Sequence, residues 1–347
     1  MTLIDGFGLH RNTYLTLMGM YFIFAGLSFH ERARRSNVIP LTLGPPGSNF
    51  SDVDALKALK PLDRGIEVEV EGEKVLLCAF TLAYIGDMPQ QQKNAGMKTQ
   101  RANLGCRFCH IASDDRGSLD FDTFLSGRYH HSVVEMRNDI DALRTKALRE
   151  TYGKIWGIDP DPASMALSKI SPALDLIQTR PSDPAHSEYN GLSNMMHSVL
   201  LEAILTAPAA NAYAAVLRSF PFPPRWPRCQ GPLHHLKSYS LSEHARWSVV
   251  VPLLLLCWLQ ERHIRPYLLA IRKKNDADPV KYLVHIFAAA ATSNCLLMGS
   301  SMTPDNQANL GAIVHSYRIQ LQALLQLVAD SMTADPRRAR SRSASVC

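Results

Sequence analysis

The sequence predicts an α/β fold with strands in its first part and helices in its last part. Short apolar segments broken by Gly and Pro fill the first third of the 347 residues, and long apolar stretches of helical pattern fill the last third. This order indicates an α/β or α+β core with a helical addition. At roughly 150 residues a domain, the length fits about two domains, and the 46% hydrophobic content is that of a globular protein.

The strand signals lie before residue 90. Apolar segments at 14–24 and 37–43 precede a Pro-Pro-Gly break, and 51–62 reads as a short helix with Ser51 as its N-cap. Residues 66–70 alternate apolar and charged side chains, a turn follows, and 75–85 continue apolar. This pattern predicts a hairpin whose second strand runs to residue 85.

Helical patterns follow a polar, irregular stretch at 90–127. The prolines at 220–227 exclude regular structure there, because proline lacks the backbone donor. Pro252 is expected to kink the helix that contains it, and the Arg/Ser-rich tail from 335 is expected to be disordered. Helices are expected over 133–151, 192–205, 240–262, 278–298 and 309–332.

Composition narrows the classes of protein that fit. The longest apolar run, 249–259, contains a proline and falls short of the about 20 residues that a membrane span needs. Residues 1–9 lack the basic start of a secretory signal. Seven cysteines at irregular spacing do not form a disulfide framework. The net charge of +6 permits a polyanionic partner without requiring one, and half of it lies in the tail.

Two aspartates stand at the ends of predicted strands. Asp5 follows an apolar triplet, and Asp87 follows the segment 75–85. On neighbouring strands two such acids can share a divalent cation, because Mg²⁺ takes one or two carboxylates together with waters and phosphates. A metal held in this way supports phosphoryl transfer. The alternative is that both residues cap turns, where Asp is common.

Cys106 and Cys109 form a CxxC pair, with His130 and His131 farther along the chain. Thiolates and imidazoles are the ligands of tetrahedral Zn²⁺, so this set is a candidate zinc site. A redox CxxC is one alternative, although it usually opens a helix after a strand. Two unbound thiols in a loop are the other alternative.

Other polar groups have both a functional and a structural interpretation. Glu188 precedes the 192–205 helix, and Glu243 lies in the first turn of the 240–262 helix, where capping and the helix dipole also explain them. His234 and His235 fit either metal binding or plain exposure. Basic clusters fit DNA phosphates or a solvated surface; they lie at 32–35, 225–228, 272–274 and 337–342.

Taken together, these motifs resemble the CACTA (En/Spm-like) DNA transposases, especially the fungal branch. The resemblance spans about 2–266, and its most specific stretch is 87–109. The stretches that carry it are Ile4-Asp5-Gly6-Phe7-Gly8, Arg11-Asn12-Thr13-Tyr14, Leu41-Thr42-Leu43-Gly44-Pro45, Gly86-Asp87-Met88-Pro89-Gln90, Gly105-Cys106-Arg107-Phe108-Cys109, Asp183-Pro184-Ala185-His186-Ser187-Glu188 and Ser240-Leu241-Ser242-Glu243-His244.

The resemblance implies an RNase H-like mixed sheet, interrupted by an insertion, whose acids bind Mg²⁺ or Mn²⁺ and cut and rejoin transposon-end DNA in the nucleus. Asp5 and Asp87 match the first two acids of such a DDE/D site. The third acid is expected to be Glu243, on a helix after the insertion, with Glu188 as second choice.

The resemblance also implies a role for the two cysteines. Cys106 and Cys109 match the pair that follows the second acid, which favours Zn²⁺ with His131 or His130 as third ligand. The implied domains are a core over 1–110, an insertion over 111–235, helices completing the core over 236–333 and a tail over 334–347. We expect no membrane partner and leave an oligomer open.

The chain departs from the family pattern at its start. The first strand is short before Asp5, and the long N-terminal DNA-binding region of family members is absent, so we expect a truncated copy. Three hypotheses follow: a transposase-derived catalytic domain, an inactive remnant that binds DNA or protein, and a CxxC redox protein. The last predicts an exposed Cys106 with a lowered pKa at a helix N-terminus.

Overall fold

Residues 1–8, 16–44, 59–161, 166–170, 174–269, 278–299 and 302–333 are described by the computed structural model. The chain divides into two units, Met1–Asp183 and Pro184–Cys347. Among the described residues the strands all lie in the first unit, and the second unit is helical. Helices and a mixed sheet together confirm the α/β class. The boundary between the units falls inside the predicted insertion at 111–235.

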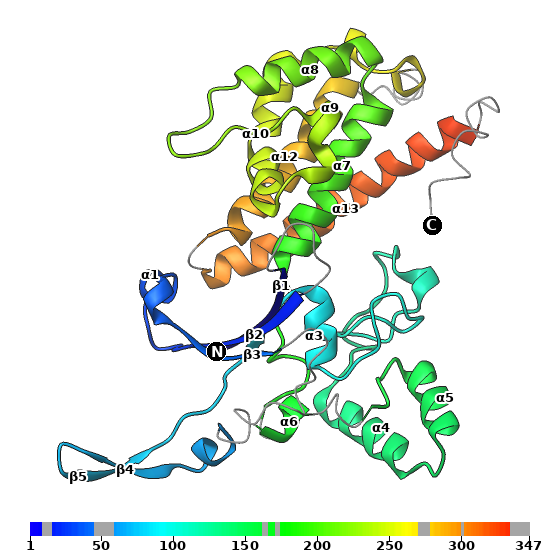
Figure 1. Cartoon of the computed structure of the whole chain (residues 1–347). Helices are drawn as coiled ribbons and strands as arrows, with labels where there is room; N and C mark the ends of the chain where they lie inside the picture. Colours follow the sequence, from blue (N-terminus) through cyan, green and yellow to red (C-terminus); the bar gives the residue numbers. More distant parts are fainter. Residues whose placement is uncertain are drawn as a thin grey trace. The chain divides into compact units, whose positions relative to one another are not determined.

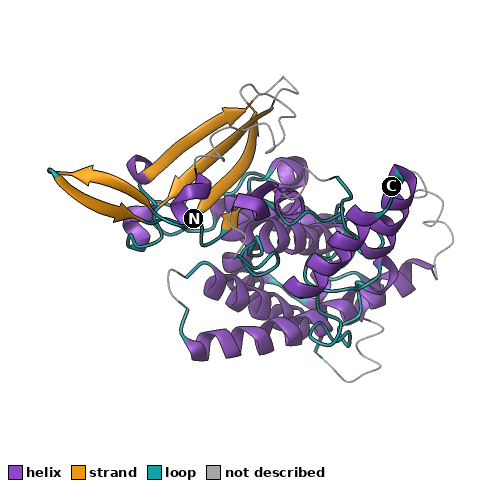
Figure 2. Ribbon diagram, turned by 90° about the horizontal axis from the view of Figure 1, so that it is seen from below, coloured by secondary structure: helices purple, strands orange, loops and turns teal. Residues whose placement is uncertain are grey.

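The first unit contains a mixed sheet of strand order β3-β2-β1-β6 (Figures 1 and 2). β1 (Thr2–Gly8), β2 (Thr16–Ile23) and β3 (Val38–Gly44) run antiparallel, whereas β6 (Tyr84–Ile85) lies parallel to β1 on its other side. β1 is therefore an inner strand. Its side chains alternate between the two faces, so that Ile4 is buried and Asp5 is exposed.

A separate two-stranded hairpin consists of β4 (Ile66–Val70) and β5 (Glu73–Leu77). Both turn residues, Glu71 and Gly72, have positive φ, which is the type I′ geometry that matches strand twist. The hairpin prediction is confirmed, but the predicted second strand over 75–85 is too long. The chain leaves the hairpin after Leu77, and β6 joins the other sheet because it pairs with β1.

Short helices make up the rest of the first unit. They are α1 (Phe29–Arg32), α3 (Met88–Asn94), α4 (His130–Ala142), α5 (Lys146–Trp156) and α6 (Ala166–Ile170). The single helix predicted over 133–151 is thus two helices, because Leu143 is extended and Thr145 caps α5. Of the helix predicted over 51–62, residues 51–58 lie outside the described residues, and Lys60–Asp63 is one 3₁₀ turn.

Two small apolar clusters form the core of the first unit. One lies against the sheet and contains Ile4, Met20, Tyr84, Leu167 and Ile170. The other joins α4 to the neighbouring loops and contains Ala95, Met97, Val133, Ile140, Ile158, Leu176 and Ile177. Neither is large for a unit of this length. Polar side chains that bind backbone carbonyls therefore contribute much of the internal contact.

Buried arginines supply part of that contact. Arg128 is 2% exposed, and its guanidinium donates to three backbone carbonyls, at 2.8–3.1 Å. These acceptors are the carbonyls of Leu104, Cys106 and Trp156. The other arginines buried among the described residues are Arg107, Arg137 and Arg180, and each also donates to backbone carbonyls.

Helix α3 is buried through polar side chains. The Gln91 amide donates to the carbonyl of Tyr84 at 2.7 Å, and the Gln92 amide donates to the carbonyl of Gly105 at 2.7 Å. Each bond satisfies a buried polar group that would otherwise destabilise the fold. α3 thereby fixes both β6 and the loop before the CxxC pair. The buried polar residues of α3 are Gln90, Gln91, Gln92 and Asn94.

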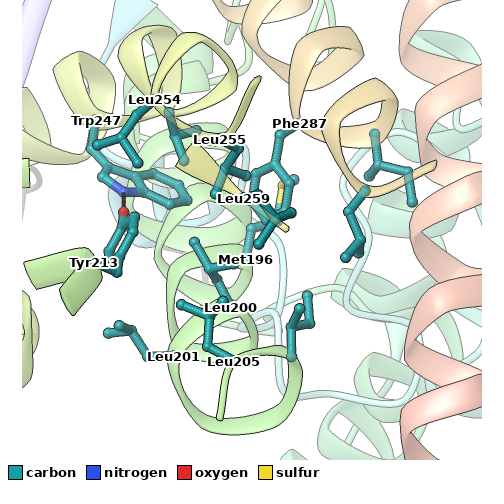
Figure 3. Close-up of a cluster of buried hydrophobic side chains, with 14 of the residues drawn as sticks. Met196, Leu200, Leu201, Leu205, Tyr213, Trp247, Leu254, Leu255, Leu259 and Phe287 are labelled. Atoms are coloured by element: carbon teal, nitrogen blue, oxygen red, sulfur yellow. Dashed lines mark hydrogen bonds between the residues drawn. The ribbon is translucent and has the colours of Figure 1, made fainter. Parts of the chain in front are cut away.

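The second unit is a helical bundle around one large apolar core (Figure 3). A helical stretch over 185–204, mixing π-helix with α7 (Asn194–Val199), precedes α8 (Ala207–Ser219). Then come α9 (Pro232–His235), α10 (Leu241–Trp258), α12 (Pro279–Leu297) and α13 (Pro304–Thr333). These bounds confirm the existence of the helices predicted in the last third, but α13 begins earlier than expected. The helix predicted over 240–262 ends at Trp258, because Leu259 is extended.

Helix α12 is long and apolar enough to cross a membrane by length and composition alone. Its side chains Leu283, Ile286, Phe287 and Ala290 are nevertheless buried in the core of the second unit. Asn294 near its end donates to Ser248 of α10 at 2.9 Å. Burial on one face and a polar tie to α10 are typical of a core helix.

We predict that Arg128→Met lowers the free energy of unfolding of the first unit by about 3 kcal/mol or more. Methionine fills similar space but leaves three half-buried carbonyls without the Arg128 donor, and an unsatisfied buried group costs ~1–3 kcal/mol. Urea titration followed by amide hydrogen exchange in residues 100–130 measures the loss. Arg101→Met, at an exposed position, is the control and should change the free energy by less than ~0.5 kcal/mol.

Candidate functional site

Asp5 lies on β1, and Asp87 lies two residues after β6, the strand that runs parallel to β1. Leu3 on β1 pairs with Ile85 on β6, so continuing two residues along each segment sets Asp5 beside Asp87. The Asp87 backbone is still extended, with φ −64° and ψ 168°. Neighbouring strands lie about 5 Å apart. The register, continued in this way, favours two carboxylates close together, and their shared binding of a cation stays a prediction.

Two glycines lie at points of close approach beside Asp5 and Asp87. A Cβ on Gly86 would lie 2.7 Å from the carbonyl oxygen of Ile4, so the backbone before Asp87 lies directly against β1. Gly19 on β2 is the partner of Asp5 across the antiparallel pair. A Cβ at that position would lie 2.5 Å from the ring of Tyr21, which covers the space beside it.

Asp87 also has a structural role. Its Oδ1 accepts a hydrogen bond of 2.7 Å from the backbone N–H of Gln90, and this bond caps the N-terminus of α3. The capping interpretation raised from the sequence is thus confirmed for Asp87. Capping uses one carboxylate oxygen, and a cation can bind the other. The half-buried position of Asp87 and the exposed one of Asp5 allow access from solvent.

The structure places both acids considered for the third position in the second unit. The Glu243 carboxylate accepts from the Ser240 backbone at 2.9 Å and completes a capping box at the start of α10. The Glu188 carboxylate accepts from Arg318 at 2.5 Å and from the Tyr317 hydroxyl at 2.8 Å. Each acid thus has a structural role inside its unit, and the choice between them stays a prediction.

The CxxC pair lies in a loop with its two sulfurs side by side. The Sγ atoms of Cys106 and Cys109 are 3.4 Å apart, near the ~3.8 Å between sulfurs that both bind one tetrahedral Zn²⁺ at 2.3 Å. Burial is the main cause that raises the pKa of the Cys109 thiol. Cys106 is half-buried and does not begin a helix, so the arrangement expected of a redox CxxC is absent from this loop.

The histidines proposed as third zinc ligand lie at the start of α4. His131 is exposed and stacks on Tyr129, with ring centroids 6.0 Å apart. His130 Nδ1 accepts from the backbone N–H of Leu176 at 3.0 Å. Within the described ranges no three His, Cys, Asp or Glu side chains converge as a metal-binding group. The cysteine pair supplies two donors, and the zinc site stays a prediction.

The basic clusters differ in their surroundings. Arg34 and Arg35 are exposed on the loop after α1, where Arg34 pairs with Glu31 at 3.0 Å. Arg225 and Arg228 are exposed in the proline-rich loop of the second unit. Residues 272–274 and 337–342 lie outside the described residues. His234 and His235 are exposed on α9, which agrees with their structural interpretation.

A buried aromatic cluster in the second unit was not predicted. His197 stacks on Trp247 with ring centroids 4.1 Å apart, and its Nε2 lies 3.3 Å from the Tyr213 hydroxyl. Trp247 Nε1 donates to the same hydroxyl at 2.7 Å (Figure 3). His197 occupies a core position of an apolar helical stretch. A histidine at such a position is the sequence signal that could have identified it.

Burial keeps this cluster neutral. The pKa of His197 is lowered well below its ordinary value, first by burial and then by the nearby His244. Burial is also the main cause that lowers the pKa of His244. Tyr213 and Tyr239 have raised pKa values for the same reason. The Nδ1 atoms of both histidines have no hydrogen-bond partner within the part of the chain that the structure describes.

No protein-family model and no curated protein matches this sequence.

We predict that the second unit loses stability as the pH falls below about 6.5. The folded-state pKa of His197 is lowered, so below pH 6.5 the unfolded chain binds protons that the folded chain does not. The contribution of each buried histidine to stability is therefore fully present above that pH and falls below it, by up to ~1.4 kcal/mol per pH unit. Urea unfolding at pH 7.5 and 5.5, followed by tryptophan fluorescence, measures the loss.

His197→Phe retains the stacking on Trp247 and removes one titrating group. Its loss of stability between the two pH values should be smaller than that of the wild type. His235→Phe, at an exposed site on α9, is the matched control and should behave as the wild type. Equal pH dependence in wild type and His197→Phe would show that His197 does not cause the effect.

Proposed function

We propose that this chain is a transposase-derived catalytic core in which Asp5 and Asp87 bind Mg²⁺ or Mn²⁺ for DNA strand cleavage and transfer. The observation that supports the proposal is the parallel pairing of β1 with β6, in which Leu3 pairs with Ile85 two residues before each acid. The sequence motifs around the same two residues are those of the resemblance to CACTA transposases. The strand pairing and the sequence motifs thus point to the same two aspartates.

The arrangement of the sheet supports an RNase H-like core. β1 carries the first acid and is an inner strand, between β2 and β6, as expected of the first strand of that fold. The second acid follows a strand that is parallel to β1 and leads directly into a helix. Further strands of that fold are not among the described elements of the first unit.

The two carboxylates fit a hard divalent cation. Mg²⁺ takes one or two protein carboxylates and leaves positions for water and phosphate oxygens. Such a cation stabilises the charge that develops on the attacking and leaving oxygens of a phosphodiester. In this chain Asp87 is held in place by its cap of α3, and Asp5 by the β1 backbone. The third acid expected from the resemblance, Glu243 or Glu188, belongs to the second unit, and its role stays a prediction.

The proposed partner is DNA, specifically transposon ends, with the nucleus as the place of action. Arg34 and Arg35 are exposed cations of the first unit that could contact phosphates. The alternative is a catalytically inactive remnant that binds DNA or protein. Both proposals require the fold, and only the first requires metal-dependent cleavage.

We predict that the purified chain nicks supercoiled plasmid DNA in Mg²⁺ or Mn²⁺. Asp5→Asn and Asp87→Asn should each reduce nicking to the level of a protein-free control. Asparagine caps helices about as well as aspartate, so Asp87→Asn retains the cap of α3 and removes the charge that binds the cation. Asp120→Asn, at an exposed position of the same unit, should nick as the wild type does. Agarose gel electrophoresis of the plasmid is the measurement.

The same assay separates the alternatives. Glu243→Gln retains a residue that fits a capping box, so its effect on nicking reports the carboxylate itself; Glu188→Gln is the comparison. Absence of nicking by a folded wild-type chain favours the inactive remnant. Nicking that persists in Asp87→Asn would overturn the proposed role of the two aspartates.

We also propose that Cys106 and Cys109 bind Zn²⁺, which the proximity of their sulfurs supports. A structural zinc needs four ligands, so His131 or His130 and a further group would complete the set. We predict about one zinc per chain by elemental analysis after purification without chelator. Cys106→Ser should lose most of the metal, whereas Cys78→Ser, at an exposed site, should retain it. Equal zinc content in both variants would overturn the site.

A further inference from the structure

The hairpin β4–β5 has one apolar face. Its register pairs Val68 with Val75 and Ile66 with Leu77, so these four side chains lie on the same face, together with Val70 and its partner Glu73 at the tip. Val70, Val75 and Leu77 are 52%, 42% and 47% exposed. The described residues therefore leave most of this face in contact with solvent.

An exposed apolar face on a lone hairpin is unfavourable in two ways. A two-stranded hairpin without packing on either face is marginally stable in water. Its outer edges also present unpaired backbone groups that invite association. In both views the hairpin projects from the rest of its unit (Figures 1 and 2). A partner that covers the apolar face would supply the packing that a lone hairpin lacks.

The charges of the hairpin are separated along its length. Glu71 and Glu73 stand exposed at the tip, whereas Lys60 and Arg64 stand exposed at the base, before β4. The half-buried Asp63 lies between the two basic residues, so the base carries a net charge of +1. The opposite face of the hairpin carries Glu67, Glu69, Lys74 and Leu76, and the Lys74 ammonium lies 2.7 Å from the Glu67 carboxylate. The apolar face is thus bordered by an acidic end and a basic end.

We propose that this face docks on the same face of a second copy of the chain, with the two hairpins antiparallel. A two-fold axis places the same patch on both subunits, so an apolar face that is complementary to itself closes into a dimer. In the antiparallel arrangement the acidic tip of one hairpin meets the basic base of the other at both ends. DNA is disfavoured as the occupant, because the hairpin carries four glutamates and one lysine.

The size of the face sets the strength of the dimer. A stable interface buries about 800 Å² on each partner, and one face of a hairpin with five residues in each strand offers less than that. The dimer is therefore weak and depends on concentration. It is independent of the proposed catalytic function, since neither Asp5 nor Asp87 belongs to the hairpin.

Sedimentation velocity of the full chain over a range of concentrations tests the dimer. The wild type should pass from monomer to dimer as its concentration rises. Val68→Lys places a charge in the apolar face and should weaken association at least tenfold. Leu76→Lys, on the opposite face and 68% exposed, is the matched control and should leave the dimer unchanged. Circular dichroism checks that both variants fold.

Charge reversal tests the antiparallel arrangement. Glu73→Lys and Arg64→Glu should each weaken the dimer, and the double variant should restore it, because the opposite charges then meet again across the interface. A double variant that stays as weak as the single ones would overturn the arrangement. A wild type that is monomeric at every concentration, or equal effects of Val68→Lys and Leu76→Lys, would overturn the docking surface itself.

Discussion

The first unit depends on hydrogen bonds from buried side chains to backbone carbonyls. α3 is the centre of this network, because its amides bind β6 on one side and the loop before the CxxC pair on the other. Arg107 and Arg180 extend it, since Arg107 donates to the carbonyl of Arg180 and Arg180 donates to that of Asn94. Burial lowers the pKa of both guanidinium groups to about 10, so both remain charged at neutral pH. The position of Asp87, at the N-terminus of α3, follows from this network.

Local sequence signals were sufficient to predict much of the secondary structure. Alternating residues and a Glu-Gly turn predicted the hairpin, and the helical periodicities predicted the bundle of the second unit. The positions of Asp5 on a strand and of Asp87 just after one were also predictable, because each acid follows an apolar segment and precedes a Gly or Pro break. These features depend on residues that are close in the chain.

The features that were missed depend on contacts between distant residues. A buried arginine that binds carbonyls has the same local sequence as a solvated one, so Arg128 and Arg180 gave no signal. The segment 75–85 reads as one strand, yet its two ends pair with different partners, β4 and β1. The two acids considered for the third position each have a structural role: Glu243 in a local capping box, and Glu188 in bonds to the distant Arg318 and Tyr317.

The two units differ in what they expose when they unfold, and this difference has a thermal consequence. The second unit buries a large apolar core, including Trp247 and Phe287, whereas the first buries many polar groups. Apolar exposure raises the heat capacity of unfolding and polar exposure lowers it. The stability curve of the helical unit is therefore the more strongly bent of the two. Cooling weakens its apolar core, while the carbonyl-bound network of the sheet unit changes less with temperature.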